Sequence, residues 1–175
     1  MSAKYKDNEI VIREAEPEDM VPVAEMIQEL ADFEKMPDGP KLSVADLQRD
    51  GFSSPPAFLC LVAEVVASRR VVGFALYFWT YSTWGGRAAQ LEDLCVRAEE
   101  RGRGVGGKLF DAVASAAVSG GCVRVDFHVL SWNPAREFYR LRGATDLSRE
   151  EDWLLYRLTG AALASRARHH QQTKQ

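Results

Sequence analysis

The chain has 175 residues, of which 46% are hydrophobic and 27% are charged. This length is typical of one domain with a single core, and the composition excludes disordered and collagen-like chains. Lys and Arg number 22 against 25 Asp and Glu, giving a formal net charge of −3. Because no large basic field is available to attract phosphates, we expect no nucleic-acid partner.

The cysteines and the N-terminus indicate the cellular compartment. Cys60, Cys95 and Cys122 are widely spaced in apolar stretches, unlike a disulfide framework or a zinc-binding pair. The N-terminus lacks the apolar stretch of a signal peptide, and no apolar run approaches the ~20 residues that span a bilayer. We therefore expect a cytoplasmic protein with reduced thiols and no membrane association.

The first half of the chain predicts a strand, two helices and a hairpin. A β-branched run at 10–12 leads into a helix from 16 to 33, whose apolar residues recur at three- and four-residue steps. A shorter helix at 43–47 begins with a serine suited to capping. Two apolar, β-branched runs at 58–66 and 71–80, separated by a short polar turn, predict a β-hairpin.

The second half predicts three more strands and two more helices. The strands are expected at 88–96, 123–130 and 153–158. The longer helix begins after Arg103 and ends at a glycine pair, and a short helix is expected at 134–141. The order β-α-α-β-β-β-α-β-α-β contains no internal repeat and no linker, which favours a single α/β domain.

The domain bounds follow from the same elements. We expect a flexible N-terminus at 1–9, one domain at 10–160 and a polar, disordered tail at 161–175, which lacks a sustained apolar stripe.

The most informative segment lies between a predicted strand and a predicted helix. It reads Arg101, Gly102, Arg103, Gly104, Val105, Gly106, Gly107 and Lys108. Glycines at this position let the backbone turn tightly and direct unpaired N–H groups toward an anion, and the helix dipole adds favourable partial charge. The segment therefore predicts a site for a phosphate-bearing ligand rather than a purely structural turn.

Two other phosphate motifs overlap this segment. A Walker A loop would require Ser or Thr after Lys108, where the chain has Leu109. The spacing of Gly102, Gly104 and Gly107, with Asp126 about 20 residues on, matches a dinucleotide fingerprint. That fingerprint belongs to the first turn of a repeated βαβ array, whereas here it lies late in the chain. We therefore favour neither an NTPase nor a Rossmann oxidoreductase.

A third interpretation starts from the pattern Arg-x-x-Gly-x-Gly at 101–106, preceded by the strand 91–96 and followed by Trp132-Asn133 and the segment 138–144. This arrangement resembles the GNAT family of acetyl-CoA-dependent N-acetyltransferases from about Ile12 to about Tyr156. Within that family the chain is most similar to the spermidine/spermine (diamine) acetyltransferases and their thialysine-acetylating relatives. The segments that carry this finer resemblance include Phe33-Glu34-Lys35, Asp50-Gly51-Phe52, Tyr81-Ser82-Thr83-Trp84, Leu91-Glu92-Asp93 and Glu151-x-Trp153.

The resemblance implies a fold and a co-substrate. The fold is α/β (α+β), a single GNAT domain with a mixed, mostly antiparallel central sheet flanked by helices, and the family's homodimer is expected. Acetyl-CoA is expected as the co-substrate, with direct acetyl transfer and no covalent acetyl-enzyme. The residues that the resemblance assigns to coenzyme binding are Leu94, Cys95 and Val96 through their main chain, the loop from Arg101 to Lys108, and Asn133, Pro134, Ala135, Arg136 and Arg142.

The chemistry of this reaction requires a base and an acid. A free alkylammonium has a pKa of about 10.4, so it must lose a proton before it can attack the thioester. The resemblance implies Glu92 as the base, acting through a water, and Tyr139 as the acid that protonates the leaving thiolate. A phenol with a pKa near 10 stays protonated at pH 7 and can donate.

The amine substrate is expected to contact acidic and aromatic residues, since spaced carboxylates suit a cation with several ammonium groups. The residues carried over by position are Phe33, Glu34, Trp84, Glu92, Asp126, Phe127, His128 and Glu151. Ser82, Asp126 and His128 depart from the spermidine/spermine pattern and favour the thialysine-acetylating branch. Which of the two amine classes is the acceptor stays open at this point.

His128 is a lone strand histidine and His169-His170 lie in the tail, so we expect no metal site. Two alternatives also stay open: a protein-lysine or aminoglycoside acetyltransferase of the same fold, and a non-catalytic coenzyme A-binding protein. We interpret the near-neutral net charge as the sum of two local fields of opposite sign. The cations are Arg101, Arg103, Lys108 and Arg142, and the acids are Glu34, Glu92, Asp126 and Glu151.

Overall fold

The computed structural model describes residues 9–172, with the side chains of 170–172 left out. The chain divides into two compact units, the first ending at Leu130 and the second beginning at Ser131. The expected domain at 10–160 therefore contains a division that the sequence pattern does not indicate.

The first unit contains the whole of the described sheet. Its elements in chain order are β1 (Ile10–Glu14), η1 (Pro17–Asp19), α1 (Met20–Phe33), α2 (Val44–Gly51), β2 (Leu59–Val65), β3 (Arg70–Ser82), β4 (Gly86–Val96), η2 (Ala98–Glu100), α3 (Val105–Ser119) and β5 (Val125–Phe127). The strand order is β1-β2-β3-β4-β5, with antiparallel pairs except for the parallel pair of β4 and β5. The predicted mixed, mostly antiparallel sheet is confirmed.

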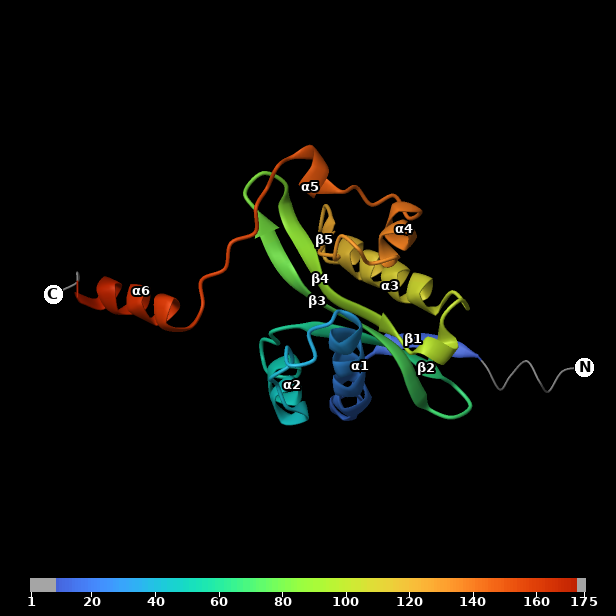
Figure 1. Cartoon of the computed structure of the whole chain (residues 1–175). Coiled ribbons are helices and arrows are strands. Elements are labelled where there is room, and N and C mark those ends of the chain that lie inside the picture. The colour runs from blue at the N-terminus through green and yellow to red at the C-terminus, as the bar shows by residue number, and fades with distance from the viewer. Residues whose placement is uncertain (1–8, 173–175) are drawn as a thin grey trace, which may run out of the picture. The chain divides into compact units, whose positions relative to one another are not determined.

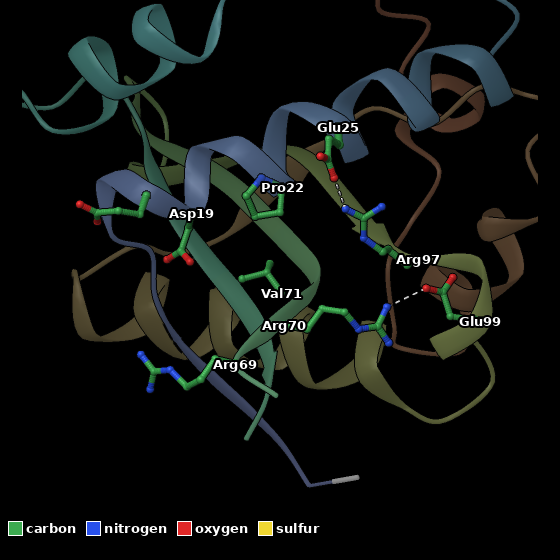
Figure 2. A pocket seen from close by; sticks show the side chains of 9 residues that line it. Asp19, Pro22, Glu25, Arg69, Arg70, Val71, Arg97 and Glu99 are labelled. Carbon is green, nitrogen blue, oxygen red and sulfur yellow. Dashed lines mark hydrogen bonds and ion pairs between the residues drawn. The ribbon is translucent and has the colours of Figure 1, made fainter. Parts of the chain in front are cut away.

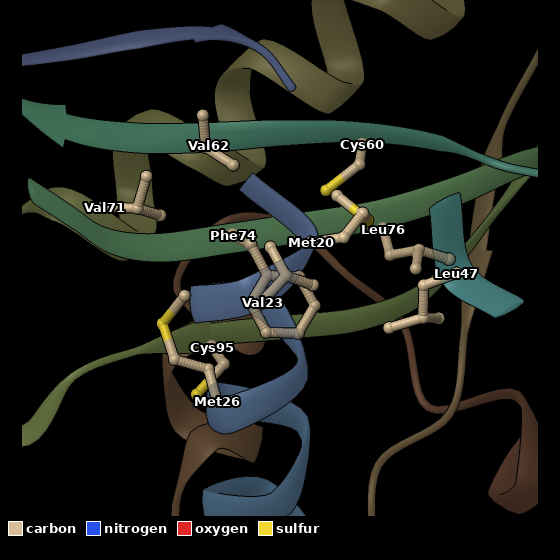
Figure 3. Packing of buried hydrophobic residues seen from close by; sticks show 10 residues of the cluster. All are labelled: Met20, Val23, Met26, Leu47, Cys60, Val62, Val71, Phe74, Leu76 and Cys95. Atoms are coloured by element: carbon tan, nitrogen blue, oxygen red, sulfur yellow. The ribbon is translucent and has the colours of Figure 1, made fainter. Parts of the chain in front are cut away.

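Helices cover both faces of this sheet, with α1 and α2 on one face and α3 on the other (Figure 1). Met20, Val23 and Met26 lie one helical turn apart along α1 and pack on Phe74 at the centre of the sheet (Figure 3). On the opposite face, Leu109 of α3 is fully buried in a second cluster of apolar residues, the α3 cluster, which includes Val72, Leu91 and Val113. The strands are apolar on both faces because both faces are covered.

Two local sequence signals form as predicted. The Ser43 Oγ accepts a hydrogen bond from the Asp46 amide (3.2 Å), and the Asp46 carboxylate accepts one from the Ser43 amide (2.9 Å). This reciprocal pair is a capping box, which satisfies two N–H groups at the start of α2. The hairpin of β2 and β3 also forms, with Leu59 opposite Tyr77.

A buried charge network joins β1, β2 and the start of α1. The Arg13 guanidinium donates to the Asp19 carboxylate at 2.6 and 3.0 Å and to the Glu64 carboxylate at 2.6 and 2.9 Å. Burial raises the pKa of Asp19, but the hydrogen bonds from Arg13 and from the Glu16 amide, together with the charges of Arg13 and Arg69, outweigh this effect and hold that pKa below its ordinary value. The network fixes the N-terminal strand to the helix that follows it.

The C-terminal part differs most from the sequence prediction. The second unit contains α4 (Ala135–Arg140), α5 (Leu147–Glu150) and α6 (Gly160–Gln172). The strand predicted at 153–158 is wrong, because its apolar residues pair with no described strand and an isolated strand is unstable. Within the tail expected to be disordered at 161–175, the structure describes α6, where alanine and long-chain residues favour a helix.

The remaining differences concern element ends. The strand predicted at 123–130 is reduced to β5, because β4 pairs with it only from Ala89 to Leu91. The expected flexible N-terminus falls on residues 1–8, and the end of the tail on 173–175; both lie outside the described residues. In the described part of the chain, no helix is both long and apolar enough to cross a membrane.

Candidate active site

A β-bulge in the middle of β4 shapes the candidate site. Leu91 pairs with Tyr77 and Asp93 pairs with Leu76, so Glu92 is an extra residue without a partner on β3. A bulge of this kind interrupts the alternation of a strand and redirects side chains. Leu91 consequently packs in the α3 cluster, while Asp93 shares the opposite face with Leu76. Glu92 is left exposed.

Asp93 is a site residue that the sequence prediction did not include. Burial, and then the charges of Glu92 and Glu34, raise the pKa of Asp93 to about 6. The bulge therefore brings together three carboxylates, from Glu34 at the end of α1 and from Glu92 and Asp93 on β4. A group of carboxylates that raises the pKa of one of its members favours a cationic ligand. The feature of the sequence that could have identified Asp93 is the adjacent pair Glu92-Asp93 within an otherwise apolar strand.

The edge of β4 beyond the bulge is open. The Arg97 amide donates to the Val72 carbonyl (2.9 Å), so alternation turns the main-chain groups of Val96 and Leu94 away from β3. In the strand pairs that the structure describes, β5 reaches only as far as Leu91 along this edge. The expected main-chain roles of Leu94 and Val96 fit this geometry, since amides and carbonyls at an unpaired edge can bind a ligand's amides. The same alternation turns the main-chain groups of Cys95 toward Phe74 of β3, so its expected main-chain role does not fit.

The predicted glycine loop joins η2 to α3. Gly102 and Gly104 have φ values of 74° and 81°, a left-handed conformation that side chains disfavour. Gly104 is the N-cap of α3, and the first helical hydrogen bond runs from the Lys108 amide to the Gly104 carbonyl (3.1 Å). The amides of Val105, Gly106 and Gly107 consequently lie at the positive end of a 15-residue helix, where anions bind.

The cations of this loop differ in how they are held. The Arg101 Nε donates to the Val96 carbonyl on the open β4 edge (2.8 Å), and the Lys108 Nζ lies 3.5 Å from the Ile10 carbonyl. Arg103 instead forms an ion pair with Glu100. Two of the loop's cations therefore contact main-chain carbonyls, and the third contacts a carboxylate.

The predicted amine-binding residues of the first unit differ in their exposure and in their ion-pair partners. Phe33 ends α1, and the Trp84 side chain is 87% exposed at the β3–β4 turn. Asp126 of β5 forms an ion pair at 2.8 Å with Arg124, the residue just before this strand. Its charge is therefore neutralised by a close neighbour in the sequence. Asp126, one of the predicted acids, is thus paired with Arg124, and Arg103, one of the predicted cations, is paired with Glu100.

Two further predicted residues, Phe127 at the end of β5 and His128 just after it, have aromatic or polar neighbours. Phe127 packs edge-on against Phe110 of α3, with ring centroids 5.9 Å apart. His128 is exposed, and its Nδ1 lies 3.4 Å from the Gln90 amide nitrogen. Phe127 therefore has a packing role, whereas His128 is accessible.

The second unit holds the predicted acid on a short helix. The Asn133 side-chain carbonyl accepts a hydrogen bond from the Ala135 amide (2.9 Å), which starts α4 just after Pro134. Tyr139 lies on α4 with its ring 5.0 Å from that of Phe138. Arg142 stacks its guanidinium 3.8 Å from the Phe138 ring centroid. The Phe138 ring thus lies between Tyr139, which it contacts edge-on, and the guanidinium of Arg142.

Two other predicted residues of this unit have internal partners. Arg136 donates to the Asp146 carboxylate (2.9 Å) and to the Ser131 carbonyl (3.0 Å). The Glu151 carboxylate accepts a hydrogen bond from the Trp153 indole (2.8 Å). The structure therefore groups Glu34, Glu92 and Asp93 in one unit, while Tyr139 and Glu151 belong to the other.

The buried thiols are unsuited to nucleophilic catalysis. Burial raises the pKa of Cys60 to about 12 and that of Cys95 to about 11, so both stay protonated at neutral pH. Among the described residues, no group of three or more histidine, cysteine or acidic side chains could hold a metal ion.

The sequence is similar to proteins of known family. The acetyltransferase (GNAT) family matches residues 23–144, a stretch that covers most of the first compact unit and the beginning of the second. Thialysine N-epsilon-acetyltransferase of Bos taurus is 40% identical over 161 residues, covering 88% of this chain and 95% of that protein. The Mus musculus protein of the same name is 42% identical over 159 residues, covering 87% and 94%.

Further relatives extend the comparison. Spermidine/spermine N(1)-acetyltransferase-like protein 1 of Homo sapiens is 40% identical over 162 residues, which cover 89% of this chain and 23% of that protein. An integron cassette protein of V. cholerae has a similar structure, with a TM-score of 0.70, 25% identity and coverage of 90% and 97%. An aminoglycoside acetyltransferase from an uncultured soil sample has the same fold, with a TM-score of 0.67, 18% identity and coverage of 86% and 95%.

Proposed function

Because this chain belongs to the GNAT acetyltransferase family, we propose that it moves the acetyl group of acetyl-CoA directly to a primary amine of a small cationic substrate. GNAT acetyltransferases use acetyl-CoA as co-substrate. The observation that carries the proposal for this chain is the β4 bulge, which places acids beside an open strand edge that leads to the glycine loop.

Glu92 is proposed as the base. It is exposed on the bulge and lies near the half-buried Asp93 and Glu34, whose charges attract an ammonium group. Binding of a cation beside three carboxylates lets one of them accept the ammonium proton, directly or through a water. Asp93, with a pKa raised to about 6, is close to the operating pH and shares this role of proton acceptor and counter-ion.

Tyr139 is proposed as the acid that protonates the departing coenzyme A thiolate. A phenol can donate a proton at neutral pH, and Tyr139 lies on a helix whose start is fixed by Asn133. The high pKa values of Cys60 and Cys95 support direct transfer rather than an acetyl-cysteine intermediate.

Coenzyme binding is proposed to use main-chain groups and a helix terminus. Leu94 and Val96 direct amides and carbonyls from the open β4 edge, which suits the pantetheine amides. The three free amides at the start of α3, with Arg101 and Lys108 beside them, suit the pyrophosphate. Pro134, Ala135, Arg136 and Arg142 of the second unit are proposed as further coenzyme contacts.

The acceptor is proposed to be thialysine or a related small diamine. Relatives that are 40–42% identical over most of both chains carry the name thialysine N-epsilon-acetyltransferase. Among the predicted amine-binding acids of the first unit, the Asp126 charge is already paired with Arg124, whereas Glu34 and Glu92 lie beside Asp93 at the bulge. A compact acidic site suits a short amine better than an extended polyamine.

The experiment that tests this function measures coenzyme A release with four acceptors offered separately: thialysine, spermidine, spermine and a histone-tail peptide. We expect release with thialysine to exceed release with the others. Preference for the peptide would indicate a protein-lysine acetyltransferase. Binding of acetyl-CoA without release with any acceptor would indicate a non-catalytic coenzyme A-binding protein.

Two variants test the assigned roles. Tyr139→Phe is expected to lower kcat and to leave the KM for acetyl-CoA unchanged, because only the donated proton is lost. Glu92→Gln is expected to alter the acidic limb of the pH–rate profile, and an unchanged profile would remove Glu92 as the base.

We also propose that the protein is cytoplasmic and forms a homodimer. Trp153, Leu154, Leu155 and Tyr156 are each about two-thirds or more exposed, and contiguous apolar residues of this kind mark an interaction surface. Light scattering coupled to size exclusion measures the mass of the particle, and a monomer at all concentrations would refute the dimer.

A further inference from the structure

Glu100 is a buried carboxylate held between two guanidinium groups. It ends η2, immediately before the glycine loop, and is 6% exposed. One of its oxygens accepts a hydrogen bond from Arg70 at the start of β3 (2.8 Å), and the other accepts one from Arg103 of the glycine loop. A buried carboxylate is stable only when it is paired, and here both oxygens are paired.

Arg70 also has a second acidic partner. Its other terminal nitrogen donates to Glu99 at 2.8 Å, as the dashed line in Figure 2 shows. These two side chains border a cavity of about 490 Å³ at the N-terminal end of α1. Arg70 is therefore shared between a buried acid and an exposed acid, since the Glu99 side chain is 56% exposed.

The position of η2 does not depend on Glu100 alone. The Arg97 amide donates to the Val72 carbonyl (2.9 Å), and the Glu100 amide donates to the Arg97 carbonyl (3.0 Å). These main-chain bonds hold η2 against β3 whatever the charge of residue 100. The charge of Glu100 consequently has its main effect on its two partners, Arg70 and Arg103.

We propose that Glu100 is an internal competitor for Arg103, and that it limits the affinity of the glycine loop for the pyrophosphate of acetyl-CoA and of the coenzyme A product. This inference rests on the proposed function. Arg103 lies between the two left-handed glycines of the loop, beside the free amides that start α3. A guanidinium that is bound to a carboxylate offers less charge to a phosphate, and the carboxylate itself repels that phosphate.

Arg70 determines how strongly Glu100 competes. When Arg70 is present, the negative charge of Glu100 is divided between two guanidinium groups, so Arg103 is held less firmly. Removing Arg70 leaves Arg103 as the one described ion-pair partner of the buried carboxylate. The proposal therefore predicts opposite effects for the two neighbours: loss of the acid strengthens coenzyme binding, and loss of Arg70 weakens it.

The experiment measures coenzyme A binding by isothermal titration calorimetry for the full chain and its variants. Glu100→Gln is expected to lower the Kd for coenzyme A by roughly fivefold to tenfold, and Arg70→Gln is expected to raise it. Product inhibition by coenzyme A should strengthen in Glu100→Gln by the same factor. With acetyl-pantetheine, which lacks the pyrophosphate, kcat/KM should be unchanged.

Two further variants separate competition from other effects. Glu99→Gln removes the same formal charge one residue earlier at an exposed position, and is expected to change the Kd by less than about twofold. In an Arg103→Gln background, Glu100→Gln should no longer strengthen binding, because the competed group is absent. If Arg70→Gln fails to fold, this double-variant comparison still decides the question.

The outcomes distinguish this inference from the proposed function. If Glu100→Gln and Arg70→Gln both weaken coenzyme A binding, the pair merely holds the loop and the competition is refuted. If Glu99→Gln strengthens binding as much as Glu100→Gln does, the effect comes from the general electrostatic potential around the loop and not from competition for Arg103, and the inference also fails. If the unchanged protein binds neither acetyl-CoA nor coenzyme A, the proposed function itself is refuted.

Discussion

Replacing Asp93 by asparagine is expected to stabilise the protein at neutral pH while impairing its reaction. Asp93 lies on the α1 face of β4, beyond the bulge at Glu92, where burial penalises its charge. Asparagine has nearly the same shape but cannot ionise. The free energy of unfolding should therefore rise in the variant wherever Asp93 is charged in the native protein.

The magnitude follows from the pKa of Asp93. Burial and the charges of Glu92 and Glu34 raise it from 3.8 to about 6. At about 1.36 kcal/mol per pKa unit this difference corresponds to about 3 kcal/mol. The unfolded chain holds fewer protons than the native protein between these two pKa values, so stability is complete below pH 3.8 and is lost as pH rises through about 6. Asp93→Asn escapes this loss.

Urea unfolding followed by tryptophan fluorescence tests this reasoning between pH 4 and pH 8. The variant and the unchanged protein should be equally stable near pH 4, and the variant should be more stable by up to about 3 kcal/mol above pH 7. For a chain of this length the same difference raises Tm by about 6–12 °C. Using the difference between the two proteins cancels the titration of groups that do not interact with Asp93.

Glu92→Gln serves as the matched control on the same strand. It removes an exposed charge that contributes to the raised pKa of Asp93, so it should stabilise the protein in the same pH range but by less. A constant difference between Asp93→Asn and the unchanged protein from pH 4 to pH 8 would refute the argument, because it would show that Asp93 does not titrate in this range.

Three further predictions concern the fold and the loop. Arg13→Leu should destabilise the protein by about 3–5 kcal/mol, because it leaves the buried Asp19 carboxylate without its ion-pair partner and the buried Glu64 carboxylate with the exposed Arg69 as its described ion-pair partner; urea unfolding checks this, with the exposed Arg49→Leu as a control that should cost much less. Gly104→Ala should cost about 1–2 kcal/mol from its left-handed φ alone, since no atom lies within 4 Å of the added methyl; an unfolding cost below about 0.3 kcal/mol would contradict the assigned conformation. Cys95→Ala should keep kcat for acetyl transfer within about twofold, and loss of turnover in a folded variant would show that the thiol is needed.

Local chemistry made much of the first unit predictable. The cap at Ser43, the hairpin of β2 and β3 and the glycine loop are each determined by residues close together in the sequence. The bulge at Glu92 could not be predicted in this way, because it depends on how β4 aligns with β3. Asp93 was missed as a result, since regular alternation would have placed it on the other face.

The remaining differences arise from long-range pairing. Glu100 and Arg70 are 30 residues apart, so nothing in the sequence around the glycine loop indicates that Arg103 shares its acid. The segment at 153–158 has the composition of a strand, but a strand needs a neighbour to pair with, and the described strands provide none for it. Composition alone cannot identify the missing neighbour.

The open edge of β4 has a consequence for how the sequence can diverge. The groups proposed to bind the pantetheine amides belong to the main chain, and every residue except proline supplies the same N–H and carbonyl. Substitutions at Leu94 and Val96 are consequently restricted by the packing of their side chains and not by the ligand. Relatives can therefore exchange apolar residues along this edge and retain the same coenzyme, so a site of this kind leaves little trace in residue identity.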